Sequence, residues 1–70
     1  MFIKINDRRV NLNNIAEYKP TEKYSSDNKK YFLIRIKFAN GTEEDVHFLD
    51  NEENRNEFLK LLDKNLNNNE

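Results

Sequence analysis

The feature that most constrains the fold of this 70-residue chain is an alternation of apolar and polar side chains on both sides of its only glycine. Every second side chain from Phe32 to Phe38 is apolar, and Val46 and Phe48 repeat the same period. A period of two is typical of a β-strand with one buried face. The dipeptide Asn40-Gly41 between these runs is a strong signal for a tight turn. The sequence therefore predicts an antiparallel hairpin over residues 30–49.

Comparing two possible turns indicates the register of this hairpin. A two-residue turn at Asn40-Gly41 places Ile36 opposite Asp45, which mixes charge into the apolar face. A three-residue turn over residues 39–41 gives apolar contacts on one face and opposite charges on the other. It predicts the pairs Phe38–Thr42, Ile36–Glu44, Ile34–Val46, Phe32–Phe48, Lys37–Glu43, Arg35–Asp45 and Leu33–His47. We therefore expect the three-residue turn, with Gly41 as the left-handed residue of a bulge.

Three shorter strands are expected before this hairpin. Residues 3–5 and 10–12 alternate apolar and polar side chains, and residues 15–19 suggest a third strand. Pro20 cannot donate a backbone hydrogen bond, so that strand is either an edge strand or ends there. Residues 20–29 are expected to form the longest polar connection.

A terminal helix is indicated by spacings of three and four. Asp50 and Glu53 have capping-box spacing, which predicts a helix from about residue 51 to about residue 66. Its apolar stripe contains Phe58, Leu59, Leu62 and Leu66, and Leu61 widens it.

Together these elements predict an α+β fold. We expect a small two-layer domain, in which the C-terminal helix packs on one face of an antiparallel sheet of four to five strands. The domain would span residues 1–66, followed by a frayed polar tail at residues 67–70.

The sequence gives little indication of catalysis. There is no cysteine, and a single glycine cannot make a phosphate-binding loop. His47 is interpreted as a solvent-facing strand residue, and successive carboxylates in a strand at residues 43–45 cannot converge on a metal. Residues 50–61 lack the glycine and the final acidic residue of a calcium loop. We therefore expect a non-enzymatic protein with no catalytic residue, metal or cofactor.

The location follows from similar exclusions. No apolar run approaches 18 residues, so we expect no membrane span. The start of the chain lacks the layout of a signal peptide, and a chain without cysteine fits a reducing compartment. The expected location is the cytoplasm.

Charge segregation points to binding surfaces. Residues 1–38 carry a net charge of +5 and residues 39–70 a net charge of −6, within a total of −1. The first hypothesis is a protein-binding module with an acidic surface that engages another protein by charge complementarity. The residues of this predicted acidic surface are Glu43, Glu44, Asp45, Glu52, Glu53 and Glu57.

Two alternatives remain open. Basic and aromatic side chains are interspersed between residues 19 and 31, as in proteins that bind single-stranded nucleic acid. The residues of this predicted nucleic-acid site are Lys19, Lys23, Tyr24, Lys29, Lys30 and Tyr31. The other alternative is a homodimer that pairs through residues 15–19 or through the strand that ends at Leu49.

An origin is suggested by composition and motifs. The Asn-rich turn at residues 11–15, the turn at residues 38–41 and the Leu-rich terminal helix resemble those of many small proteins from AT-rich bacteria and their phages. The lack of catalytic motifs and the segregation of charge lead us to expect that the protein-binding module is an inhibitor or regulator, encoded by a phage or another mobile element, that acts through the acidic surface.

Overall fold

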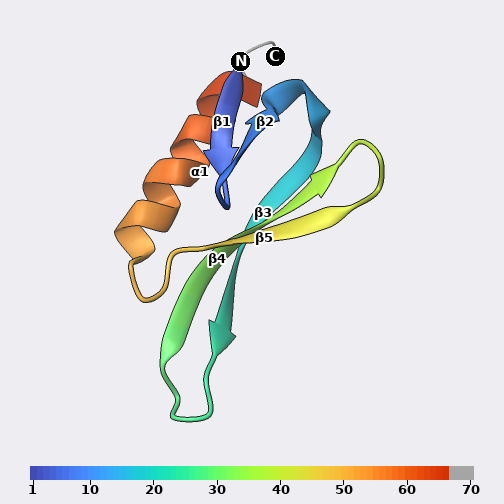
Figure 1. The fold of residues 1–70 in the computed structure, drawn as a ribbon. Coiled ribbons are helices and arrows are strands. Elements are labelled where there is room, and N and C mark those ends of the chain that lie inside the picture. The colour runs from blue at the N-terminus through green and yellow to red at the C-terminus, as the bar shows by residue number, and fades with distance from the viewer. Residues whose placement is uncertain (67–70) are drawn as a thin grey trace.

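The computed structural model describes residues 1–66, so the predicted frayed tail at residues 67–70 lies outside the described residues. Five strands precede one helix (Figure 1). Their bounds are β1 (Phe2–Ile5), β2 (Arg8–Asn11), β3 (Ile15–Tyr24), β4 (Lys30–Phe38), β5 (Glu43–His47) and α1 (Glu52–Leu66), with a 3-10 turn at Leu12–Asn14. The predicted α+β class with a terminal helix is confirmed. Within residues 1–66, no helix is long and apolar enough to cross a membrane.

The strands form two antiparallel sheets, so the expectation of a single sheet was wrong. β1 pairs only with β2, and the second sheet has the order β3-β4-β5. The 3-10 turn explains the division, because it redirects the chain between β2 and β3. The Asn11 side chain accepts a hydrogen bond from the Asn13 N–H at 3.0 Å and so stabilises this turn. Leu12, which was expected in a strand, is buried in the turn instead.

The β4–β5 hairpin has the predicted register. Each pair from Leu33↔His47 to Lys37↔Glu43 is present. The Phe38 N–H donates to the Thr42 carbonyl at 2.8 Å, which closes the three-residue turn. Gly41 has φ of +91°, the left-handed conformation expected for the bulge.

β3 continues through Pro20, so the polar connection is shorter than predicted. β3 is an edge strand, and Pro20 lies opposite Ile34. The Ser25 N–H donates to the Lys29 carbonyl at 2.9 Å, so these residues form a hydrogen-bonded pair. Because bonded and non-bonded pairs alternate, Pro20 and Ile34 form a non-bonded pair, in which the Pro20 nitrogen points away from β4. The missing N–H therefore costs no ladder bond. Only residues 25–29 connect the two strands.

The core lies between the three-stranded sheet, the β1–β2 hairpin and α1 (Figure 1). Phe58, Leu59 and Leu66 of the predicted stripe pack against this core, and Leu62 is fully buried in it. Leu61 was expected to widen the stripe but is 38% exposed. The buried core residues are Ile5, Val10, Leu12, Ile15, Ile34, Ile36, Phe38, Val46 and Leu62.

The helix cap is Asn51 and not the predicted Asp50. The Asn51 side chain accepts a hydrogen bond from the Asn54 N–H at 2.9 Å. Strand pairing continues one residue past Phe48, since the Phe32 N–H donates to the Leu49 carbonyl at 2.7 Å. The turn that follows therefore ends at Asn51, which places the cap one residue later.

Arg55 is a core contact that the apolar pattern did not indicate. Its side chain is 11% exposed, and its guanidinium lies 5.0 Å from the centre of the Phe32 ring. It also donates to the Thr21 carbonyl at 3.4 Å and lies 4.0 Å from the Glu22 carboxylate. Arg55 thus continues the helical stripe and links α1 to β3 and β4.

Candidate functional site

The outer face of the three-stranded sheet, opposite α1, pairs much of its charge internally. The Arg35 guanidinium donates to the two Asp45 carboxylate oxygens at 3.0 and 3.4 Å. Lys23 Nζ lies 3.7 Å from the same carboxylate. The hydrogen bonds from Arg35 lower the pKa of Asp45, and they raise the pKa of Arg35 itself. The charges of Arg35, Asp45 and Lys23 are therefore largely compensated within this face.

The predicted acidic surface is spread over three places. Register puts Glu43 and Asp45 on the outer face and Glu44 on the opposite face of β5, and α1 carries the other three carboxylates. Glu44 contacts the Arg8 guanidinium and accepts a hydrogen bond from Asn6 Nδ2 at 2.8 Å.

Most of these six carboxylates already have a basic neighbour. On the helix, Glu52 lies 3.6 Å from Arg55, and Glu57 lies 3.7 Å from Lys60. Together with Glu44 and Asp45, four of the six are in ion pairs. The structure therefore does not gather the predicted acidic surface into one patch.

The predicted nucleic-acid residues lie on the β3–β4 hairpin but not on one face. Because facing residues of paired strands share a side, Lys19, Lys23 and Tyr31 lie on the outer face. Tyr24 and Lys30 lie on the opposite face, and Lys29 lies in the turn.

Three of the four lysines in this set also have an acidic neighbour. Lys30 lies 3.3 Å from Glu22, whose hydrogen bond raises the pKa of Lys30. Lys29 lies 4.0 Å from Asp27, and Lys23 contacts Asp45 as described above. A hydrogen bond from the Ser25 hydroxyl lowers the pKa of Asp27 in the same turn. A phosphate backbone would have to compete with these pairs.

His47 and the carboxylates of β5 are the titratable side chains that the sequence analysis considered for metal binding or catalysis. His47 is exposed and lies opposite Leu33, as the sequence indicated. Among residues 1–66, no three His, Asp or Glu side chains are grouped closely enough to hold a metal ion.

The β1–β2 hairpin is held beside the second sheet by its turn. Asn6 and Asp7 have φ of +48° and +70°, as a two-residue hairpin turn requires. The Asn6 amide donates to the Asp45 carbonyl at 2.9 Å in addition to its bond with Glu44. Arg8 follows, and its guanidinium lies 5.5 Å from the centre of the Phe38 ring. These contacts fix the position of β2 relative to the β4–β5 turn.

A cleft of about 480 Å³ lies between β2 and the β4–β5 turn. Its lining contains two arginines and no carboxylate, unlike the outer sheet face. Arg9 makes no ion pair within the part of the chain that the structure describes. The lining residues are Phe2, Arg8, Arg9, Val10, Asn11, Asn14, Phe38, Ala39, Asn40 and Thr42. We call this site the hairpin cleft.

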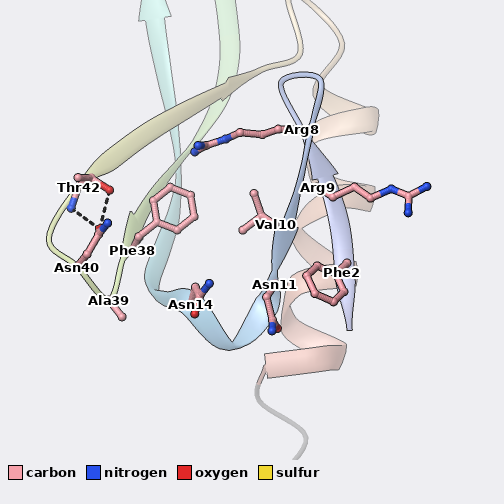
Figure 2. A pocket seen from close by; sticks show the side chains of 10 residues that line it. All are labelled: Phe2, Arg8, Arg9, Val10, Asn11, Asn14, Phe38, Ala39, Asn40 and Thr42. Atoms are coloured by element: carbon pink, nitrogen blue, oxygen red, sulfur yellow. Dashed lines mark hydrogen bonds between the residues drawn. The ribbon is translucent and has the colours of Figure 1, made fainter.

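The two walls of the hairpin cleft differ in character. In Figure 2, Arg8 and Val10 point toward Phe38, whereas Arg9 points away on the other side of β2. The opposite wall is the β4–β5 turn, where the Asn40 side chain accepts hydrogen bonds from the Thr42 N–H at 3.0 Å and its hydroxyl at 2.7 Å. The Asn40 side-chain oxygen on that wall is already occupied by these two hydrogen bonds, whereas the β2 wall carries the two arginines.

Sequence reasoning did not identify the hairpin cleft. The cleft depends on the placement of residues 8–11 beside residues 38–42, which is a tertiary arrangement. One local signal was present: Phe2 is out of phase with the buried Ile5 in β1, and it is 64% exposed.

Comparison with protein-family models, with curated proteins and with solved structures found no match, so no relative indicates which surface is functional.

Proposed function

We propose that the chain is a small non-enzymatic protein-binding module that contacts its partner through the hairpin cleft. The observation that carries this proposal is the cleft lining, with two arginines, two phenylalanines and no carboxylate. Aromatic and arginine side chains are enriched where proteins contact one another. Phe2 is an aromatic side chain and Arg9 an arginine in the lining of the cleft.

The hairpin cleft supports the proposal better than the surfaces first predicted from sequence. The acidic carboxylates are divided among three places, and four of the six are neutralised by basic neighbours. The basic and aromatic residues of the β3–β4 hairpin face two sides of the sheet. A role as an inhibitor or regulator from a phage or another mobile element, acting in the cytoplasm, fits a small binding module without cysteine.

The test uses the full chain immobilised and exposed to a lysate of the source organism. Arg9→Glu reverses the charge of the unpaired arginine, and Lys37→Glu is the matched control on the outer face of β4. We expect a protein that is retained by the wild type and by Lys37→Glu but is lost with Arg9→Glu. Thermal unfolding of all three proteins checks that each is folded.

Other outcomes assign the function elsewhere. Retention of no protein, or equal retention by all three chains, would overturn the proposal. Loss of the partner on charge reversal at Glu43 and Glu53 instead would move the contact to the predicted acidic surface. Binding of short DNA or RNA oligomers that weakens steeply with salt would favour the nucleic-acid alternative.

A further inference from the structure

The hairpin cleft follows the edge of a strand and not one of its faces. Its lining includes Arg8 and Val10 from one face of β2 and Arg9 and Asn11 from the other. A pocket for a compact ligand would be lined by one face of the hairpin. A strand that adds to the edge of β2 would instead contact side chains on both faces, because the side chains of a strand alternate between the two faces of a sheet.

The backbone of β2 is oriented for such a strand. The Leu12 N–H donates to the Met1 carbonyl at 2.9 Å, so these two residues form a hydrogen-bonded pair. Because hydrogen-bonded and non-bonded pairs alternate in an antiparallel ladder, Ile3 and Val10 form the next bonded pair. Arg9 therefore directs its backbone N–H and C=O away from β1, and Asn11 directs its N–H the same way. Within residues 1–66, no strand pairs with this edge of β2.

The two free edges of the three-stranded sheet differ from the free edge of β2. The long free edge of β3 carries Pro20, a residue that blocks strand addition. The free edge of β5 is covered at Asp45, whose carbonyl accepts the hydrogen bond from Asn6. The edge of β2 beside the cleft has neither kind of protection.

We propose that the hairpin cleft binds an extended acidic segment of a partner protein, which adds as a strand to the free edge of β2. This inference rests on the proposed function and specifies the occupant of the same site. Main-chain bonds to Arg9 and Asn11 supply affinity, and side-chain pockets on alternate sides supply specificity.

Charge complementarity determines the chemistry of the segment. The residue opposite Arg9 shares its face and meets an unpaired guanidinium, so an acidic side chain is favoured there. The residue opposite Val10 faces the Phe38 side of the cleft, so an apolar side chain is favoured. The segment is therefore acidic and then apolar at successive positions. A second copy of this chain fits less well, because it would bring four guanidinium groups to one interface with only two Glu44 carboxylates beside them.

The experiment measures binding of a labelled synthetic hexapeptide in which Asp alternates with Val. One matched peptide carries Lys in place of Asp, and another carries N-methyl groups on alternate backbone nitrogens, which prevent strand pairing but keep the charge. We expect the Asp peptide to bind, with at least a tenfold loss for each matched peptide. Arg9→Glu is expected to lose at least tenfold, and Lys37→Glu to bind like the wild type.

Amide hydrogen exchange by NMR gives a readout that charge attraction alone would not produce. The Arg9 and Asn11 N–H groups are expected to exchange at least tenfold more slowly in the complex. The inference is overturned if the N-methylated peptide binds as well as its parent, or if neither amide is protected. It is also overturned if light scattering gives twice the monomer mass and these amides are protected without peptide, because the occupant is then a second copy.

The same readouts separate the inference from the function on which it rests. A partner from the lysate that depends on Arg9 but leaves both amides unprotected keeps the protein-binding function and rejects strand addition. If no partner depends on Arg9 and no peptide binds, both proposals fail.

Discussion

The β4–β5 and β1–β2 hairpins of this chain have different surroundings. The β4–β5 hairpin has β3 on one edge, and its outer face carries the Arg35–Asp45 pair. The β1–β2 hairpin has no strand neighbour within the described residues and is attached through its apolar side chains and its turn. The β4–β5 hairpin thus has one edge paired with β3 and a charge pair on its outer face, whereas the β1–β2 hairpin has an unpaired strand edge at β2 and, within residues 1–66, no ion pair at Arg9.

The strongest test of this comparison asks how much stability the β1–β2 hairpin contributes. Ile5 in β1 and Ile36 in β4 are both fully buried. Ile5→Ala and Ile36→Ala are each expected to cost about 2–5 kcal/mol, because both leave a cavity in one shared core. Urea unfolding measures both losses. A loss below about 1 kcal/mol for Ile5→Ala alone would mean that the hairpin is an appendage and not part of the core.

The comparison also explains what sequence reasoning achieved. The register of β4–β5 was predictable because short-range cross-strand pairs distinguish the two possible turns. The division into two sheets was not predictable, since it depends on how the 3-10 turn at Leu12–Asn14 redirects the chain. Asn51 replaced Asp50 as the cap because a backbone bond between Phe32 and Leu49 lengthens the preceding segment.

The candidate site was less accessible to sequence reasoning than the fold. Pairing Lys23 with Asp45, or Arg8 with Glu44, joins residues distant in the chain, so their mutual neutralisation could not be read from composition. The hairpin cleft likewise exists only after both hairpins are placed. What the sequence did indicate correctly was local, namely the Arg35–Asp45 pair and the left-handed Gly41.

Arg55 provides the next largest expected effect, because it secures the far end of the β3–β4 pair. Arg55→Met keeps an unbranched side chain but removes the contacts with the Phe32 ring, the Thr21 carbonyl and Glu22. We expect a loss of about 1–3 kcal/mol in urea unfolding.

Two controls accompany this substitution. Arg55→Lys keeps the charge but not the planar fork, and an intermediate loss is expected. Lys60→Met removes a partner of Glu57 at an exposed helix position and is expected to change stability by less than about 0.5 kcal/mol. Equal effects at positions 55 and 60 would show that Arg55 is only a surface charge.

Substitutions in the β4–β5 turn and in the β1–β2 turn are expected to change the stability of the fold in opposite directions. Gly41 and Asp7 both have positive φ, but only the β4–β5 turn has a glycine. Gly41→Ala is expected to cost about 1 kcal/mol through backbone strain alone, since an added Cβ meets no atom within 4 Å. Asp7→Gly is expected to add up to about 1 kcal/mol, because it creates the Asn-Gly pair favoured in two-residue hairpins. Thermal unfolding measures both changes, and a gain for Gly41→Ala or a loss for Asp7→Gly contradicts this account.

The smallest effect comes from the Arg35–Asp45 pair that distinguishes the β4–β5 hairpin. The pKa of Asp45 in the folded chain lies below its ordinary value of 3.8, mainly because Arg35 donates to the carboxylate. A carboxyl group with a lowered pKa stabilises the fold above its ordinary value, and that stability is lost as the pH falls through the folded value. The two side chains are 39% and 23% exposed, so solvent screening keeps the contribution of this pair to stability small.

A double-mutant cycle with Arg35→Met and Asp45→Asn isolates this contribution from the other carboxylates of the chain. At pH 7 the coupling free energy from urea unfolding is expected to be favourable, and it should decline toward zero below about pH 4. The β1–β2 hairpin provides the contrast, because Arg9 has no acidic partner within residues 1–66 that could be protonated. Arg9→Met is therefore expected to change stability by less than about 0.5 kcal/mol at either pH. A coupling between Arg35 and Asp45 that is absent at pH 7, or unchanged at pH 3, would remove the electrostatic distinction between the two hairpins.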